Sequence, residues 1–348
     1  MGWVFQSAYE SFHENREIWD GLNKTHGNHI LLDSMFVEPL IRHFGSRDTL
    51  LALSNDPKNP GMVLMDRGKK GFWQTFQPPQ EPLGLILLGS RDGVTEQMHE
   101  LIRSLPGHAL GFSALQQDPD STIFKDLNPC KKVEILEYIK TARLTCTGTF
   151  EDYWKKRGKD LVDNIARRRR RLERQGVQFE LVIDYDENQM IECIQEYGKL
   201  EGFGWKAARG SAVTDDNRQG IFYREILEHF CRQGEGVFYR LLFDKKTVAS
   251  QFGLKRGGTL VLLKMAYNED MREHSPGFLL QERIFHSLFS KKEINTVEFY
   301  GRVRDGWTTK WTDEIRTMYH VNFYRWGWIA GTRRFLKSSS WPWRSAGK

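Results

Sequence analysis

Residues 236–291 constrain the fold more than any other part of the chain. Three segments rich in apolar, β-branched and aromatic residues follow one another: 236–243, 247–256 and 259–267. They are separated only by Asp244-Lys245-Lys246 and Gly257-Gly258, and connections this short join antiparallel strands as hairpins. Directly after the third segment, a short polar loop leads into a helical pattern at 277–291. The region therefore predicts an antiparallel sheet whose last strand leads into a helix.

The loop before this helix, which ends in Ser275-Pro276-Gly277, has two interpretations. If the strand ends at Tyr267 and the helix begins near Gly277, the first helical N–H groups and the helix dipole form a site for a phosphate or pyrophosphate. Ser275 could cap the helix or contact a phosphate oxygen, and Gly277 would let the backbone approach closely. Alternatively, Ser-Pro-Gly is simply a good helix start, since Pro276 suits a first turn.

Elsewhere the chain alternates short strands and helices in an α+β order. Helices are expected at 8–24, 34–44 (with Ser34 as N-cap), 93–104, 150–176 (ended by Gly176), 187–201 and 217–233. Further strands are expected at 49–53, 61–66, 71–76, 83–89, 108–115, 133–146, 177–183 and 295–300. The first half shows a looser version of the order in the second half, which predicts a tandem repeat.

This repeat defines the expected domains. Residues 1–147 form an N-terminal half, residues 148–337 form a C-terminal half, and residues 338–348 form a flexible tail. The segment 133–146 is long enough for a strand that crosses between the halves.

Composition excludes several classes of protein. The chain has 348 residues, of which 39% are hydrophobic and 13% aromatic, so it can build a packed core. It has no stretch of 18 uninterrupted apolar residues and no secretory signal pattern at its N-terminus. Its four cysteines are widely spaced and its histidines lack metal-ligand spacing. We therefore expect a cytoplasmic protein with reduced core thiols and no metal.

The positive charge is concentrated in one segment. The net charge is +6, and residues 151–174 alone carry five more basic than acidic side chains, including the run Arg167–Arg171. Such a segment favours an anionic partner, whether phosphate, polysaccharide, RNA or a membrane surface. The run covers more than one helical turn, so it cannot all face one ligand. Most of it is expected to be a solvated face, with a role in holding an anionic partner as the alternative.

Several short motifs together carry a resemblance to a known family. Arg272, Ser275 and Gly277 occupy the first, fourth and sixth positions of the Q/R-x-x-G-x-G/A phosphate loop of the GNAT acyltransferases, with Ser275 in place of a glycine. The other motifs are NIARRRRRLERQG (164–176), FGW-K (203–206) followed by Gly210-Ser211, and EFYGRVRDGWTTKW (298–311). The chain resembles the FemAB-like, BioF2-like (CelD-type) group of tandem GNAT proteins, clearly over 145–335 and weakly over 5–145.

The resemblance implies a tandem GNAT-like fold with mixed, mostly antiparallel sheets flanked by helices, and an acyl-CoA co-substrate. The strand before the phosphate loop would diverge from its neighbour, so that its free edge pairs with the pantetheine arm. The residues implied to contact the co-substrate are Leu262, Leu263, Lys264, Met265, Ala266, Arg272, Ser275, Pro276, Gly277 and Phe278. Acyl transfer would then be a direct attack on the thioester, catalysed by positioning and by polarising its carbonyl.

Catalytic candidates are fewer. Tyr267 and Tyr300 are expected at the ends of adjacent strands, where either phenol could protonate the leaving thiolate; both could instead be ordinary core or rim aromatics. Glu201 could act as the general base, with a solvated helix end as its alternative.

The acceptor is expected to contact a second set of residues. Gln251 could orient it or be an exposed strand residue, and Lys310 could bind an anionic acceptor or be solvated. Trp311 follows Lys310 in the family's late motif, and Trp205 and Lys206 lie in a glycine-rich, lid-like loop.

These observations predict a cytoplasmic acyl-CoA-dependent N- or O-acyltransferase. Its acceptor would be an amine or hydroxyl of a sugar, polysaccharide precursor or similar metabolite, and the CelD-type resemblance associates it with cellulose or exopolysaccharide synthesis. Nucleic acid enters only under an alternative, a FemX-like aminoacyl-tRNA-dependent transferase, which the basic helix favours. A non-catalytic binding module is a further alternative. Peripheral membrane contact and the oligomeric state are left open.

Overall fold

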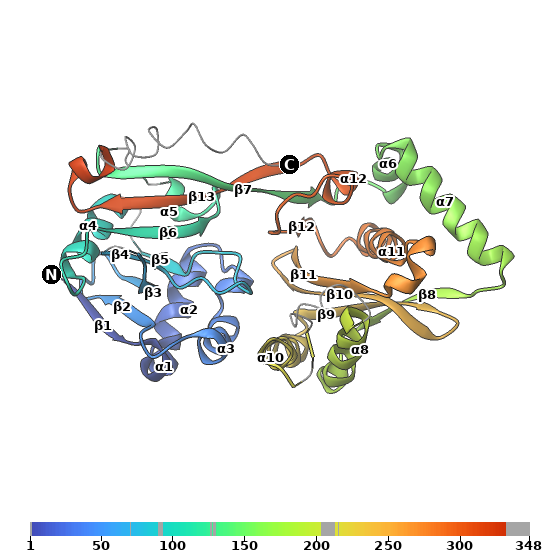
Figure 1. Ribbon diagram of the computed structural model, residues 1–348, viewed down its shortest axis with the longest axis horizontal. Helices are drawn as coiled ribbons and strands as arrows, with labels where there is room; N and C mark the ends of the chain where they lie inside the picture. Colours follow the sequence, from blue (N-terminus) through green and yellow to red (C-terminus); the bar gives the residue numbers. More distant parts are fainter. Residues whose placement is uncertain are drawn as a thin grey trace, which may run out of the picture. The chain divides into compact units, whose positions relative to one another are not determined.

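The computed structural model of the protein describes residues 2–69, 71–89, 93–125, 127, 130–202, 213–214 and 216–331. The described part of the chain divides into two compact units, one formed by residues within 2–139 and 317–331 and the other by residues within 140–316. The strands and helices of both units are labelled in Figure 1. Within the described part of the chain, no helix has the length and apolar composition needed to cross a bilayer.

The N-terminal unit is built on a mixed sheet. Its strands are β1 (Trp3–Ser7), β2 (Leu50–Ser54), β3 (Gly61–Arg67), β4 (Phe72–Thr75), β5 (Ile86–Leu88), β6 (Gly111–Gln117) and parts of β7 (Val133–Thr145) and β13 (Ile315–Tyr324). Its helices are α1 (Ala8–Ser11), α2 (Arg16–Thr25), α3 (Ser34–Phe44), α4 (Val94–Ser104) and α5 (Thr122–Lys125), with 3₁₀ turns η1 (His13–Asn15) and η2 (Ile30–Leu32). The apolar face of α4 packs with the inward residues of these strands in one hydrophobic cluster.

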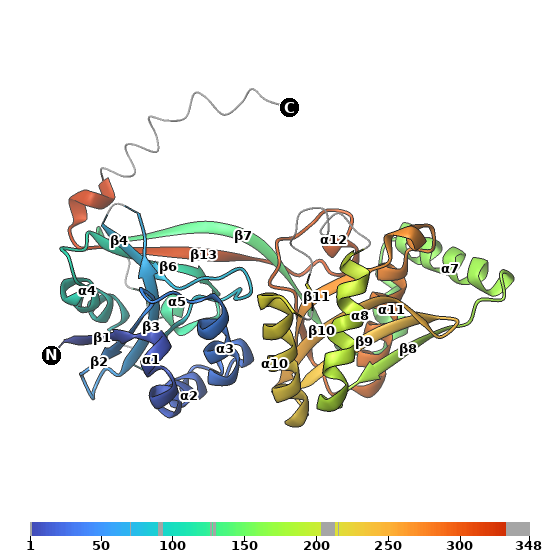
Figure 2. The same ribbon diagram turned by 60° about the horizontal axis from the view of Figure 1, so that its bottom comes forward.

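The second unit has the same kind of layers. Its strands are β8 (Phe179–Asp184), β9 (Gly236–Phe243), β10 (Lys246–Arg256), β11 (Thr259–Tyr267) and β12 (Thr296–Glu298), completed by the end of β7. Its helices are α6 (Phe150–Lys155), α7 (Lys159–Arg174), α8 (Met190–Gly202), α10 (Arg218–Arg232), α11 (Pro276–Lys291) and α12 (Thr308–Trp311), with 3₁₀ turns η3 (Glu187–Gln189) and η4 (Glu269–His274). Helices α8 and α10 cover one face of the sheet and α11 the other, as Figure 2 shows.

The two units repeat one strand order. In the first, β1, β2, β3 and β4 pair antiparallel in sequence, β4 pairs parallel with β6, and β6 pairs antiparallel with β13. In the second, β8 to β11 pair antiparallel in sequence, β11 pairs parallel with β12, and β12 pairs antiparallel with β7. This order confirms the expected GNAT-like fold, with mixed, mostly antiparallel sheets flanked by helices.

The last strands of the two repeats are exchanged. β7 follows β6 in the sequence but pairs with β12, whereas β13 follows β12 and pairs with β6. The described residues 317–331 therefore group with the N-terminal unit, although the sequence analysis assigned 148–337 to the second half. The division at residues 147 and 148 stays a prediction about the repeat, and the tail 338–348 lies outside the described residues.

Most elements of the second unit lie where the sequence predicts them. β9, β10 and β11 match within one residue, and positive φ angles at Asp244, Lys245, Gly257 and Gly258 form the two hairpin turns. Gly176, with φ +71°, ends α7 as expected.

Other local predictions were wrong. Strands β1 and β13 were missed, and the helix expected over 150–176 is two helices, broken where Gly158 precedes α7. Asp33, and not Ser34, caps α3, because its side chain accepts a hydrogen bond from the Met35 N–H at 2.8 Å. Cys130 is exposed and not part of the core, although all four thiols are free as expected.

Glu81 is a carboxyl buried inside the N-terminal unit. Its side chain is 1% exposed, and its Oε1 accepts a hydrogen bond from the Leu83 N–H at 2.7 Å. Its Oε2 has no hydrogen-bond partner among the described residues. Burial raises the pKa of this carboxyl well above its usual value, and the Leu83 N–H lowers it only in part.

We expect Glu81→Gln to change how the stability of the protein depends on pH. The folded state holds the Glu81 proton to a higher pH than the unfolded chain does, so stability is lost as pH rises from the ordinary carboxyl pKa through the raised one. Glutamine does not ionise, so the variant should be more stable than wild type at pH 8, by a margin that shrinks toward pH 4. Urea denaturation at both pH values measures this, with exposed Glu137→Gln as control. A margin that does not vary with pH would contradict it.

Candidate active site

The candidate site begins where strand β11 loses one of its two neighbours. On one side β11 pairs with β10 along its whole length, from Arg256 opposite Thr259 to Ala249 opposite Tyr267. On the other side it pairs with β12 only through Thr259, Leu260 and Val261. Residues 262–267 therefore have a paired edge toward β10 and an edge that lies outside the β12 ladder. An edge of this kind presents backbone N–H and C=O groups that an extended ligand can bind.

A bulge in β11 accompanies this divergence. Phe252 lies opposite Lys264 and Gly253 opposite Leu262, so Leu263 is the extra residue. At Gly253 a Cβ atom would lie 2.5 Å from the Val261 carbonyl oxygen, so only glycine allows β10 to approach β11 this closely. The bulge shifts Lys264 toward the α10 face, where its ammonium lies 5.4 Å from the centre of the Tyr223 ring and bonds Gln219 at 3.2 Å.

The loop after β11 ends in an uncapped helix N-terminus. Ser275, between η4 and α11, has left-handed backbone angles (φ 53°, ψ 53°), and its side chain makes no capping hydrogen bond. Its carbonyl accepts hydrogen bonds from the N–H groups of Phe278 and Leu279 at 3.0 and 3.2 Å. Pro276 is the first helical residue and has no N–H. The positive end of the α11 dipole thus meets no side-chain acceptor of the loop, which is the physical requirement for an anion site.

Gly277 lies in the closest part of this arrangement. A Cβ atom there would lie 3.3 Å from Tyr267 Cδ1, 3.6 Å from Met265 Sδ and 3.6 Å from Trp307 Cη2. The glycine therefore brings the start of α11 against the end of β11. Met265 and Tyr267 belong to the part of β11 beyond the β12 ladder, so this strand edge and the helix N-terminus are neighbours.

The other predicted site residues have different environments. Tyr267 is 40% exposed at the end of β11, while Tyr300 is 7% exposed beyond the end of β12, with the Arg316 guanidinium 5.4 Å from its ring centre. Arg272 is an exposed residue of η4. Trp205 and Lys206 lie outside the described residues.

Glu201 and Gln251 are buried, so the solvated and exposed alternatives for them were wrong. Glu201 is 4% exposed and accepts hydrogen bonds from the Tyr197 hydroxyl and the Val213 N–H, both at 2.8 Å. Burial, followed by the Glu201 charge, raises the pKa of Tyr197 well above its usual value, so this phenol stays protonated. Gln251 is 6% exposed, and its Oε1 has no hydrogen-bond partner within the described residues.

Lys310 and Trp311 are adjacent in sequence but differ in environment. Trp311 is fully buried in the hydrophobic cluster of the second unit, with its ring 5.5 Å from Phe285 and 5.8 Å from Phe278 between centroids. Its ring packs in the core, and its contact with the acceptor stays a prediction. Lys310 lines a cavity of about 180 Å³ together with Ser275 and Phe278.

The arginine run on α7 divides by environment and is not one solvated face. Arg169 forms an ion pair with Glu282 of α11, which is 2% exposed, and Arg171 pairs with Glu273 at 2.8 Å. Arg168 lines the same cavity as Ser275 and Lys310. The sequence analysis missed this residue as a candidate. The signal was the stripe of Leu161, Ile165, Arg168 and Leu172, whose spacing of four, three and four puts them on one face of the helix.

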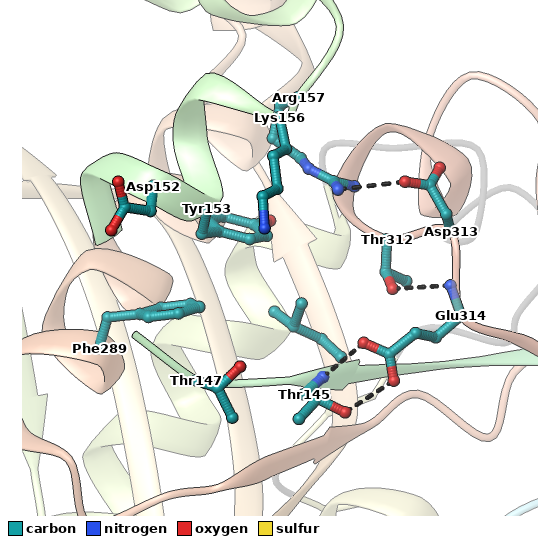
Figure 3. A pocket seen from close by; sticks show the side chains of 11 residues that line it. Thr145, Thr147, Asp152, Tyr153, Lys156, Arg157, Phe289, Thr312, Asp313 and Glu314 are labelled. Atoms are coloured by element: carbon teal, nitrogen blue, oxygen red, sulfur yellow. Dashed lines mark hydrogen bonds and ion pairs between the residues drawn. The ribbon is translucent and has the colours of Figure 1, made fainter. Parts of the chain in front are cut away.

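A second cavity, of about 260 Å³, lies beside α6 and is drawn in Figure 3. Its polar groups mostly bond one another: Arg157 pairs with Asp313 at 3.1 Å, and Glu314 accepts hydrogen bonds from the Thr145 N–H and hydroxyl at 2.9 and 2.7 Å. Burial raises the pKa of Tyr153, whose hydroxyl donates to the Trp311 carbonyl at 2.8 Å. These contacts fasten α6 and the chain after α12 to β7, which is a structural role.

Burial determines the protonation state of three thiols in the second unit. Burial raises the pKa of the Cys146, Cys193 and Cys231 thiols to about 12, so these three do not form thiolates at neutral pH. Among the described residues, no group of three or more His, Cys, Asp or Glu side chains is arranged to hold a metal ion.

Comparison with known proteins identifies the class. Residues 159–307 match the family model described as an acetyltransferase (GNAT) domain. This segment contains α7 to β12 and the loop before α11. The chain thus contains a GNAT-type acetyltransferase domain, and the protein is an acyltransferase. Domains of this type use acyl-CoA. No curated protein sequence matches the chain.

Solved structures agree on the fold. FemX is 9% identical, with 92% of this chain and 98% of FemX covered and a TM-score of 0.55. L-PGS from Bacillus licheniformis is 12% identical, covering 91% of this chain and 96% of that one with a TM-score of 0.51. The C-terminal domain of an Agrobacterium fabrum protein assigned as a lysylphosphatidylglycerol synthetase is 12% identical, covering 86% and 90% with a TM-score of 0.51. At these identities the similarity concerns the fold alone.

The Arg169–Glu282 pair gives a stability prediction. Arg169→Gln leaves the buried Glu282 carboxylate with Arg283, 3.9 Å away, as its remaining ion-pair partner. The free energy of unfolding should fall by about 1–3 kcal/mol. Arg170 is the matched control, because its guanidinium donates a hydrogen bond to the Ala166 carbonyl of its own helix at 3.4 Å. Arg170→Gln should change stability by less than about 0.5 kcal/mol. Equal losses in the two variants, measured by urea denaturation, would contradict the assignment.

Proposed function

We propose that the protein is an acyl-CoA-dependent N- or O-acyltransferase of the FemAB-like, BioF2-like (CelD-type) group. The observation that carries this proposal is the junction of β11 and α11. Residues 262–267 lie outside the β12 ladder and lead, through η4, to the uncapped N-terminus of α11. A donor that combines an amide-rich arm with a pyrophosphate matches both halves of this junction: the strand edge suits the amides and the helix N-terminus suits the phosphates.

The residues present fit such a donor. Gly277 leaves open a space that a Cβ would fill, against Tyr267 and Met265. We assign Leu262, Leu263, Lys264, Met265, Ala266 and Tyr267 to the pantetheine arm, and Arg272, Ser275, Pro276, Gly277 and Phe278 to the pyrophosphate. The exposed Arg272 forms no ion pair with any residue that the structure describes, so its charge is available to an anion.

When bound, the donor supplies an activated thioester carbonyl. The chain contributes binding and orientation through β11 and α11, and proton transfer through side chains of the same unit. Tyr267 and Tyr300 are the proposed proton donors to the leaving sulfur. Glu201 is the proposed base, and the hydrogen bonds from Tyr197 and Val213 fix its carboxylate in position. Gln251, whose buried Oε1 has no partner among the residues that the structure describes, is proposed to orient the acceptor, and Trp205 and Lys206 are proposed to cover it.

The acceptor we propose is an amine or hydroxyl of a sugar, polysaccharide precursor or similar metabolite, and the setting is cellulose or exopolysaccharide synthesis in the cytoplasm. Its support is the CelD-type resemblance of the motifs in residues 164–176 and 298–311.

Binding of acetyl-CoA and longer acyl-CoAs tests the proposal directly. By calorimetric titration, wild type should bind at least one of them, and Gly277→Trp should lose that binding. The reason is that the indole would fill the space between the start of α11, Tyr267 and Met265. Gly21→Ala in α2 is the control, since a Cβ there meets no atom within 4 Å. No binding by wild type, or equal binding by Gly277→Trp, would refute the site.

A second candidate is an aminoacyl-tRNA-dependent transferase, which the exposed arginines Arg167, Arg170 and Arg174 of α7 favour. An RNA ligand of this surface would lose affinity steeply between 50 and 200 mM salt. We expect no such salt-dependent binding of tRNA in a filter assay. Steep salt dependence that is reduced in an Arg167→Gln, Arg170→Gln, Arg174→Gln triple variant, together with no affinity for acyl-CoA, would instead support the tRNA function.

A further inference from the structure

The cavity of about 180 Å³ at the start of α11 is lined by three elements of the second unit. Helix α7 contributes Leu161, Asn164, Ile165 and Arg168, the α11 junction contributes Ser275 and Phe278, and α12 contributes Lys310. Leu161, Ile165 and Phe278 provide an apolar wall. Its charged lining residues are both cations, and no lining residue is acidic.

Arg168 differs from its four neighbours in the arginine run by its contacts. Arg167 bonds the Asn164 side chain at 2.8 Å, Arg169 pairs with Glu282, Arg170 bonds the Ala166 carbonyl at 3.4 Å and Arg171 pairs with Glu273. Arg168 makes no hydrogen bond or ion pair with any residue that the structure describes. It is half-buried, so part of its hydration has been removed without a compensating partner.

Lys310 of α12, which lines the same cavity, is in the same situation. Its backbone N–H bonds the Trp307 carbonyl, but its ammonium has no hydrogen-bond or ion-pair partner in the described part of the chain. Two half-buried cations that share one cavity repel each other, at a cost that an anion between them would remove. Ser275 also lines this cavity, and its hydroxyl makes no capping hydrogen bond to α11. Because Ser275 directly precedes α11, the positive end of the helix dipole lies at the same cavity.

The packing of α7 holds Arg168 in place. Arg169, the next residue along α7, forms an ion pair with Glu282, and Arg171 forms one with Glu273. On the same face of the helix as Arg168, Ile165 and Leu172 are buried against the core. Because the helix backbone is already fixed in this way, only the Arg168 side chain loses freedom on binding a phosphate.

We propose that Arg168 and Lys310 form a phosphate subsite for the nucleotide end of the acyl donor. This inference rests on the proposed function, and it deepens it in two ways. It assigns the α7 helix to donor recognition, and it moves Lys310 from the acceptor to the donor. The phosphate is either part of the pyrophosphate or the 3′-phosphate of the ribose, and both have the charge and oxygen acceptors that two such cations recognise.

Calorimetric titrations of four proteins test this subsite: wild type, Arg168→Gln, Lys310→Gln and the matched control Arg170→Gln. The ligands are acetyl-CoA, acetyl-dephospho-CoA and S-acetylpantetheine. Arg168→Gln and Lys310→Gln should each weaken acetyl-CoA binding by about tenfold to a hundredfold. Both should bind S-acetylpantetheine as wild type does, since it lacks the phosphates, and Arg170→Gln should match wild type for every ligand.

The dephospho ligand distinguishes the two phosphates. If Arg168→Gln weakens acetyl-CoA but not acetyl-dephospho-CoA, the subsite holds the 3′-phosphate; if it weakens both, the subsite holds the pyrophosphate. Either result supports the inference. Equal acetyl-CoA affinity in wild type, Arg168→Gln and Lys310→Gln would overturn it while leaving the proposed function intact.

Failure of the proposed function gives a different result. If wild type binds no acyl-CoA, inorganic pyrophosphate is titrated into wild type and Arg168→Gln. Pyrophosphate binding that needs Arg168 would support a phosphate subsite without the acyl-CoA function, and no binding would overturn both. A loss of S-acetylpantetheine binding in Arg168→Gln would also count against the subsite, because that ligand has no phosphate to lose.

Discussion

The site depends on how short the ladder between β11 and β12 is, because these strands pair through three residues on each strand. A parallel neighbour for the whole of β11 would satisfy its backbone groups and close the sheet. Because the ladder stops at Val261 and Glu298, the next six residues of β11 have one edge outside the β12 ladder while β10 pairs with the other. Gly253 makes the bulge beside this point possible, since any side chain would meet the Val261 carbonyl. The end of the β12 ladder, the bulge and the start of α11 therefore together form the candidate site.

The same order of strands and helices appears twice. The sheet of each repeat is completed by the strand that comes, in the sequence, after the last strand of the other repeat. β7 closes the sheet beside β12, and β13 closes the sheet beside β6. A strand that completes a sheet covers backbone groups that would otherwise be exposed, so each unit depends on residues distant in sequence. The pattern of apolar residues along a strand does not identify such a distant partner, which is why β13 was missed. For the same reason the compact units do not divide at residues 147 and 148.

The basic helix α7 illustrates how one run of identical residues can do several things. Arg169 neutralises a buried carboxylate, Arg171 pairs at the surface with η4, Arg170 returns to its own helix and Arg168 lines a cavity. Helical geometry makes this inevitable, since successive residues are rotated by about 100° around the axis. The net charge of the segment indicated an anionic partner, but only the neighbours of each side chain show which arginine is available to it.

The sequence by itself determined the hairpins of 236–267, the strand–loop–helix passage through Ser275-Pro276-Gly277 and the GNAT-like class, because tight turns, apolar alternation and helix starts are local signals. It also selected Ser275, Gly277 and Lys310 as residues of interest. The tertiary structure decided where β12 stops, which strand closes each unit, that Glu201 and Gln251 are buried, and that Arg168 and Lys310 share a cavity with Ser275. These features depend on contacts between residues far apart in the chain, and a pattern of nearest neighbours does not contain them.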